Sequence, residues 1–218
     1  MEWLLLIPVL LYSIVLHEVA HAWVARREGD DTADRLGRVT LNPIPHLDLV
    51  GSVLVPAALA YFGSGAILGW AKPVPVNPAN FRSPVWGDIR VSMAGIVVNL
   101  LLAVFFTLTI VPMAYLVDPV DASDALRTAM SVSFFGVFIN LLLAIFNLVP
   151  IPPLDGSHVV RHLLPKGLQA GYQAIGQYGI LILFAIIMIA PGGFDLILVP
   201  VNFLTEVLFS FFGLTGRV

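Results

Sequence analysis

Residues 3–25 read WLLLIPVLLYSIVLHEVAHAWVA and decide the fold class of this 218-residue chain. The stretch is long enough to cross a bilayer, whose hydrocarbon core needs about 20 apolar residues in a helix. Its second half contains His17, Glu18 and His21. Ionisable residues inside a spanning helix are costly and mark functional sites by default. The stretch therefore predicts a membrane helix that carries part of a functional site.

The composition of the whole chain indicates the same class. Hydrophobic residues make up 58% of it and charged residues 11%, with no cysteine and a formal net charge of −3. Soluble domains have about 25% charged residues, because their exterior must be solvated. These figures exclude a disordered chain, a nucleic-acid-binding module and a disulfide-stapled secreted scaffold. We expect a single integral membrane domain over residues 1–218, surrounded by the lipid bilayer.

Other apolar stretches predict further membrane helices. Four of them qualify or nearly qualify as spans, at residues 91–117, 128–149, 175–190 and 194–214. A less regular stretch, 49–70, is interrupted by a proline and glycines, and it either re-enters the membrane or spans it. The proline-rich loops 42–45 and 72–78 are expected to be extended. We predict an all-α polytopic membrane protein with about five to six transmembrane helices, a re-entrant stretch and short extended membrane-associated loops.

The basic residues favour re-entry of the 49–70 stretch. On that layout only Arg127, of eleven lysines and arginines, lies on the far side of the membrane. Basic loops stay in the cytoplasm, so the N-terminus is expected outside and the C-terminus inside. A plain sixth span would place the basic residues before and after it on opposite sides. The residues that orient the chain are Arg26, Arg27, Arg35, Arg38, Lys72, Arg82, Arg90, Arg161, Lys166 and Arg217 inside, and Asp118, Asp121 and Asp124 outside.

His17 and His21 are spaced i and i+4, so their side chains lie on one face of a helix. Two imidazoles at this spacing can bind one metal ion, and Glu18 can reach a water molecule on the same ion. This is the HExxH pattern of zinc hydrolases. The alternative is a polar patch that hydrogen-bonds between helices. A catalytic zinc site usually has a third protein ligand, and the candidates are Asp155, His158, His162 and His46.

Asp155 has the most favourable context of the four candidates. It follows a run of prolines within 150–153, which break the 128–149 helix near its cytoplasmic end. His17 lies roughly 21 Å into the first span at 1.5 Å per residue. On the preferred topology, both groups therefore lie at a similar depth.

Three motifs together resemble the site-2 proteases, a family of intramembrane zinc metalloproteases. They are HEVAH at 17–21, GIVVN at 95–99 and NLVPIPPLDG at 147–156. Each occurs on its own predicted span and in the order of the family. The runs 69–75 and 154–158 are similar to those of a short prokaryotic branch without the PDZ domain of larger relatives. Ile96 and Ser157 differ from common family residues, but neither change removes a ligand.

The resemblance implies one zinc ion per chain, bound by His17, His21 and Asp155. It implies that Glu18 is the catalytic base. Asn99 would hold the substrate strand or the developing oxyanion.

The resemblance also implies a domain organisation and a location. The catalytic core would comprise about residues 3–162, followed by a helical hairpin at about 173–214. The substrates would be transmembrane-helix proteins. They would be cleaved near the cytoplasmic side of a prokaryotic plasma membrane.

Four other side chains are considered for supporting roles. His158 either orients a metal ligand through a hydrogen bond, or is a further ligand, or acts only within its own loop. His46 has similar alternatives, because its loop can fold back over the site. His162 is expected to be solvated among basic neighbours. Asn147 is expected to brace the broken helix end, with substrate contact as the alternative. The proline-rich loops either hold an unwound substrate strand by β-addition or only cover the site.

Two other classes of function remain open at this level. A metal-ion transporter or channel also places His and Asp in the membrane, but it requires neither Glu18 nor Asn99. A protease-like scaffold that binds transmembrane partners without cleaving them is disfavoured by an intact Glu18. The physiological substrate and the oligomeric state do not follow from the sequence.

Overall fold

The computed structural model describes residues 3–54, 61, 71–116, 122–189, 192 and 195–216. Within these ranges the chain is helical and contains no β-strand. Three of its helices are long and apolar enough to cross a membrane: α1 (Trp3–Glu28), α4 (Pro84–Leu116) and α5 (Asp124–Leu148). The all-α class with membrane helices is confirmed. Further spans stay a prediction, because α8 (Gly176–Ile189) has 14 residues and α9 (Asp195–Phe211) has 17.

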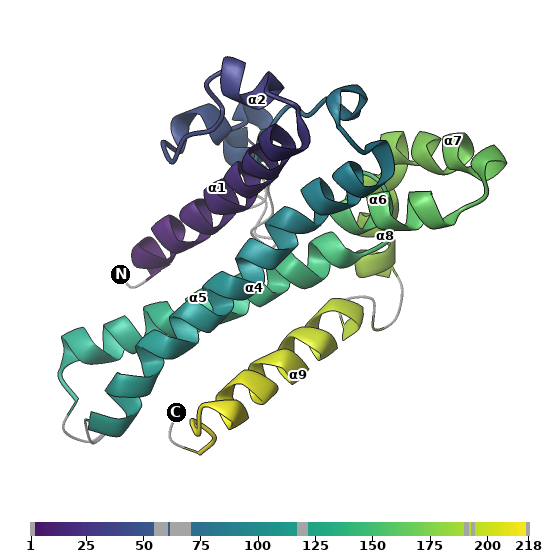
Figure 1. Cartoon of the computed structure of the whole chain (residues 1–218). Coiled ribbons are helices and arrows are strands. Elements are labelled where there is room, and N and C mark those ends of the chain that lie inside the picture. Colours follow the sequence, from purple (N-terminus) through teal and green to yellow (C-terminus); the bar gives the residue numbers. More distant parts are fainter. Residues whose placement is uncertain are drawn as a thin grey trace.

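The helices α4 and α5 form an antiparallel pair in the middle of the molecule (Figure 1). α1 packs against both of them, and α9 packs along α5 on the other side of the pair (Figure 1). The short helices α6 (Asp155–Leu163) and α7 (Lys166–Ala174) lie at the end where α4 begins (Figure 1). The second half of α1, the first half of α4 and the beginning of α6 therefore come together.

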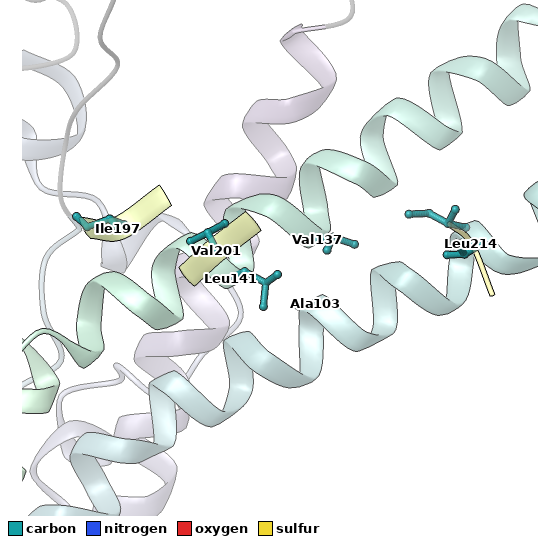
Figure 2. Close-up of a cluster of buried hydrophobic side chains, with 7 residues drawn as sticks. Ala103, Val137, Leu141, Ile197, Val201 and Leu214 are labelled. Carbon is teal, nitrogen blue, oxygen red and sulfur yellow. The ribbon is translucent and has the colours of Figure 1, made fainter. Parts of the chain in front are cut away.

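Small residues let these helices approach closely, as is usual for helices that pack in lipid. Gly136 of α5 faces the ring of Phe106, and a β-carbon at Gly136 would lie 2.5 Å from Cδ1 of that ring. A buried apolar cluster joins α4, α5, α9 and the turn that follows α9 (Figure 2). Its members are Ala103, Ile110, Val137, Leu141, Ile197, Val201 and Leu214. Because lipid tails are equally apolar, such contacts stabilise the bundle mainly through close van der Waals packing.

α4 begins at Pro84, whereas the predicted span begins at residue 91. Proline is favoured at the first helical position, where its missing N–H costs no hydrogen bond. The added turns contain the charged residues Asp88 and Arg90, so hydropathy alone did not place these turns in the predicted helix. They place Asp88 beside α6.

Short helical turns occupy the described part of the chain between α1 and α4. They are α2 (Thr32–Arg35), the 3-10 turns η1 (Ile44–His46) and η3 (Pro78–Asn80), and the π-helical turn η2 (Leu49–Leu54). The extended conformation predicted for 42–45 is wrong. The side chain of Asn42 accepts a hydrogen bond from the N–H of Ile44 at 3.1 Å, which favours a turn there. Residues 71–77 carry no helix, in agreement with the prediction for the second loop.

Parts of the predicted topology fall outside the described ranges. Most of the stretch 49–70 is among them, so its re-entry stays a prediction. Asp118, Asp121 and Arg217, which helped to orient the chain, are also outside. The hairpin at 173–214 stays a prediction, because most of the residues that would join α8 to α9 are not described.

The chain breaks after α5 as the prolines predict. α5 ends at Leu148, and the turn that follows contains a cis peptide bond between Pro152 and Pro153. Asp155 is the first residue of α6. The turn thereby directs the start of a new helix toward α1 and α4.

Candidate metal centre

Three side chains from two helices meet at one point. His17 and His21 extend from one face of α1, and Asp155 extends from the first turn of α6. The Nε2 atoms of the two histidines lie 3.0 Å apart. Oδ2 of Asp155 lies 3.2 Å from Nε2 of His17 and 3.3 Å from Nε2 of His21. The fold therefore joins the first motif to a residue from a different helix far along the chain.

A backbone carbonyl fixes which ring nitrogen of His21 donates a hydrogen bond. Nδ1 of His21 lies 2.7 Å from the carbonyl oxygen of Val91 on α4. A carbonyl oxygen can only accept, so Nδ1 donates and carries the proton. In the neutral ring, Nε2 then has a lone pair that faces Asp155.

A chain of hydrogen bonds fixes Nδ1 of His17 as a donor in the same way. Nδ2 of Asn140 donates to the carbonyl of Gly136 at 2.9 Å, so its Oδ1 accepts from Nδ2 of Asn99, also at 2.9 Å. Oδ1 of Asn99 then accepts from Nδ1 of His17 at 2.6 Å, and in the neutral ring this leaves a lone pair on Nε2. Asn140 also donates to Oγ of Ser13 at 2.9 Å. The network thus links all three candidate spans.

Three electron-rich atoms therefore face one another. Oδ2 of Asp155 is buried and has no hydrogen-bond partner. The ligand atoms of a tetrahedral zinc site with bonds of about 2.0–2.1 Å lie about 3.3–3.4 Å apart. The three atoms here are 3.0, 3.2 and 3.3 Å apart. Two imidazoles and a carboxylate, with a fourth position left for water, fit a catalytic zinc ion.

Gly95 of α4 makes room for the first histidine. A β-carbon at this position would lie 2.5 Å from Nε2 of His17. Any other side chain would therefore push the ring out of its place. Val91, Gly95 and Asn99 follow one another at i, i+4 and i+8, so a single face of α4 contacts both histidines.

Glu18 reaches toward the segment 71–77. Its side chain accepts a hydrogen bond at Oε2 from the backbone N–H of Val74 at 2.8 Å. Val74 lies between Pro73 and Pro75, which have no N–H, so it is the one donor that this Pro-Val-Pro run offers. The backbone of segment 71–77 therefore holds the carboxylate that the family resemblance implies as the catalytic base.

Hydrogen bonds fix the first half of segment 71–77. The N–H of Lys72 donates to the carbonyl of His46 at 2.9 Å. The guanidinium of Arg38 donates to the carbonyl of Lys72 at 2.8 Å and approaches that of Pro73 at 3.3 Å. The loop before α4 is thus tied to the region that follows α1.

Asp30 fixes the second half of this segment. It is 1% exposed, and its Oδ2 accepts from the N–H of Asn77 at 2.7 Å. Its Oδ1 accepts from Nδ2 of Asn80 at 2.8 Å and from the N–H of Thr32 at 3.2 Å. Burial raises the pKa of Asp30, but the hydrogen bonds from Asn77, Thr32 and Asn80 outweigh it and hold the pKa below its ordinary value of 3.8.

The sequence is similar to that of a known protein over most of the chain. The family model described as "Peptidase family M50" matches residues 109–190. The chain is 40% identical over 190 residues to the protein named "Putative zinc metalloprotease YwhC" from Bacillus subtilis (strain 168). That match covers 86% of this chain and 81% of the relative. The chain belongs to peptidase family M50, the site-2 proteases. No solved structure matches it.

In this site-2 protease the residues predicted as metal ligands lie together. Among the described residues, one group of potential metal-binding side chains has ligand atoms that converge. Its members are His17, His21 and Asp155. Family membership implies a metalloprotease, and the donor set fits zinc. The role of each ligand, and that of Glu18 as base, stay predictions for experiment.

The two asparagines predicted near the substrate are both engaged within this site-2 protease. Asn99 is fully buried, and its amide contacts His17 on one side and Asn140 on the other. Asn147 donates from Nδ2 to the carbonyl of Leu143 in its own helix at 2.9 Å, close to the end of α5. The substrate and oxyanion roles stay predictions. The contacts of Asn99 favour a role in orienting the ring of His17.

The expectation for His162 is wrong. Its side chain is 12% exposed, and its Nε2 lies 2.7 Å from Oδ2 of the buried Asp88. Asp88 precedes the apolar stretch 91–117 and was therefore not part of the predicted span. His158 also contacts Asp88, at 3.1 Å, and does not join the metal ligands. His46 is buried and donates from Nε2 to the carbonyl of Thr40 at 3.0 Å, so it belongs to its loop.

Sequence reasoning missed several buried polar residues of this site-2 protease, among them Ser13, Asp30, Asp88 and Asn140. For Ser13 and Asn140 the available signal was a polar residue within a predicted span, which is costly unless it has a partner. Asp88 gave no such signal, because it precedes the apolar window. The contact of Glu18 with Val74 involves the backbone and therefore leaves no trace in residue types.

Proposed function

We propose that this protein is an intramembrane zinc metalloprotease that hydrolyses peptide bonds of transmembrane-helix substrates near the cytoplasmic side of a prokaryotic plasma membrane. The observation that carries the proposal is the convergence of three ligand atoms, two of them from the helix that also carries Glu18 and is long enough to span a membrane. Membership of the site-2 protease family supports the reaction class.

Glu18 moves the proton in the proposed reaction. A zinc ion bound by His17, His21 and Asp155 would activate a water molecule and polarise the substrate carbonyl. Because Oε2 of Glu18 is held by the N–H of Val74, Oε1 is the oxygen that accepts the proton of that water. Glu18 then donates this proton to the leaving amine nitrogen as the C–N bond breaks.

The surroundings of the histidines keep them ready to bind metal. Both rings donate from Nδ1, to Asn99 and to the carbonyl of Val91. Such contacts orient ligand histidines and raise their basicity toward the metal. The α4 face therefore positions both ligands before substrate arrives.

Segment 71–77 is the described segment that contacts Glu18, and a substrate strand at the site would lie next to it. Extended backbone can hold an unwound strand by β-addition. Pro73 and Pro75 have no N–H and the N–H of Val74 is bound to Glu18, so the Pro-Val-Pro run would pair with a substrate strand through its carbonyl oxygens.

Contacts between the two ends of the α1–α4 connection support the re-entrant layout. The N–H of Arg82 donates to the carbonyl of Glu28 at 2.7 Å, and Asp30 accepts from Asn77. The chain therefore returns to the end of α1 from which it departed. On this layout the last turn of α1 and the start of α4 face the cytoplasm.

The decisive experiment measures zinc content and cleavage on the same preparations. Purified wild type in detergent should contain about one zinc ion per chain and cleave members of a panel of single-span peptides. Glu18→Gln should keep the zinc and lose cleavage by roughly 10²–10⁴-fold, the usual contribution of a general acid–base group. Glu206→Gln changes an exposed glutamate of α9 and should keep both properties.

Two outcomes would contradict the proposal. Zinc-loaded wild type that cleaves no peptide, including peptides weakened by helix-breaking residues, would exclude the protease. Zinc flux into proteoliposomes that survives Glu18→Gln would favour a transporter instead.

Single cysteines test the orientation, because the natural chain has none. Cysteines at the exposed positions Leu36 and Ala79 should be labelled from the same side of the membrane, and one at Ala122 from the other side. Labelling of Leu36 and Ala79 from opposite sides would show that the 49–70 stretch spans.

A further inference from the structure

A buried carboxylate beside the metal centre has three basic partners. Asp88 of α4 is 3% exposed. Its Oδ2 accepts from the guanidinium of Arg161 at 2.7 Å and lies 2.7 Å from Nε2 of His162. Its Oδ1 lies 3.1 Å from Nδ1 of His158. All three partners belong to α6, the helix whose first residue is Asp155.

Two of the three partners share one face of α6 with the metal ligand. Asp155, His158 and His162 follow one another at i, i+3 and i+7, on successive turns. On α4, Asp88 precedes Val91 by one turn, and the carbonyl of Val91 holds a metal ligand of α1. The same part of α4 therefore contacts both helices that supply ligands.

α6 depends on such an anchor for its position. It has nine residues, and isolated helices shorter than about 12–15 residues are marginal. A proline-rich turn precedes it, and Pro165 follows it. Among the described contacts, the carboxylate of Asp155 meets the two histidines and has no other polar partner. The location of the third ligand is therefore set by the location of α6.

We propose that Asp88 positions the third metal ligand, Asp155, by clamping α6 to α4. The inference rests on the metal centre of the proposed function, but it concerns zinc affinity rather than cleavage. Loss of the Asp88 carboxylate leaves Arg161 partly buried without its counter-charge, a costly state that α6 relieves by moving toward solvent. Asp155 moves with it, and zinc is then held by two histidines alone.

The test compares the zinc affinity of full-length variants in detergent by competition with a chelator. Asp88→Asn should weaken zinc binding about tenfold, at the lower end of the effects of groups that orient ligands. Asp34→Asn, which breaks an exposed pair with Arg26, should leave it unchanged. Asp155→Asn removes the ligand itself. In that background Asp88→Asn should cause no further loss, because both changes act through one contact.

Two results would overturn the inference: unchanged zinc affinity in Asp88→Asn, or an equal further loss when Asp155→Asn is already present. If Asp88→Asn folds poorly, Arg161→Gln makes the same test from the α6 side, with the same absence of additivity expected. Wild type that holds zinc but cleaves nothing would contradict the proposed function. The zinc affinities of the variants would still decide the role of Asp88.

Discussion

Nδ1 of His17 lies 2.6 Å from Oδ1 of Asn99, although 82 positions separate the two residues in the chain. The contact joins the spans α1 and α4 at the depth of the metal centre. Its direction is fixed by Asn140, whose own orientation depends on a backbone carbonyl of α5. The packing of three helices thus sets which ring nitrogen of a metal ligand donates a hydrogen bond.

Asn99→Leu removes the oxygen that accepts a hydrogen bond from Nδ1 of His17. Zinc affinity, measured by chelator competition, should fall about 10–100-fold, as is typical when the group that orients a ligand histidine is lost. Asn99→Asp keeps an acceptor at this position and should retain most of the affinity. A raised KM with unchanged zinc affinity would indicate the substrate contact that the family resemblance implies.

Gly95→Ala places a methyl group against His17. Because the β-carbon would lie 2.5 Å from Nε2, the ring must leave its position, and the zinc content of the purified protein should fall. Gly167→Ala is the matched control, since nothing lies within 4 Å of a β-carbon there. Equal zinc content in the two variants, measured by elemental analysis, would mean that α4 moves away at no cost to the site.

Val74→Pro removes the N–H that holds Glu18. We expect kcat to fall about tenfold with zinc content unchanged, the effect of losing one hydrogen bond to a charged group. Val74→Ala keeps the N–H and loses only packing against Ala22 and Ala33, so it separates the two contributions. An increase of kcat in Val74→Pro would show that the bond restrains the base rather than positions it.

Asp30 should make the stability of the protein depend on pH in the acid range. Since its pKa in the folded protein lies below 3.8, its contribution is complete above that value and is lost as the pH falls through the lower, folded pKa. Thermal unfolding in detergent should therefore show a smaller loss of stability below about pH 4 in Asp30→Asn than in wild type. Asp34→Asn should behave like wild type, and a wild-type slope in Asp30→Asn would contradict the prediction.

Local patterns were sufficient for much of the candidate site. The i, i+4 spacing of His17 and His21 holds on any helix, and the prolines before Asp155 stop a helix wherever it packs. Such patterns do not predict the partners of Asn140 and Asp88, because a lone Asn in an apolar span and an Asp at the edge of a span have many available partners. The error for His162 has the same origin, since its environment depends on a residue of another helix.

Residue types and spacing establish the membrane as solvent, the HExxH pair and the broken helix before Asp155, because hydropathy and helix geometry act within short stretches of chain. Contacts between helices settle the rest: which nitrogen of each histidine faces the metal, which backbone N–H holds Glu18, and which carboxylate anchors α6. These properties depend on hydrogen-bond partners that are distant in sequence, and a partner exists only once the helices have packed.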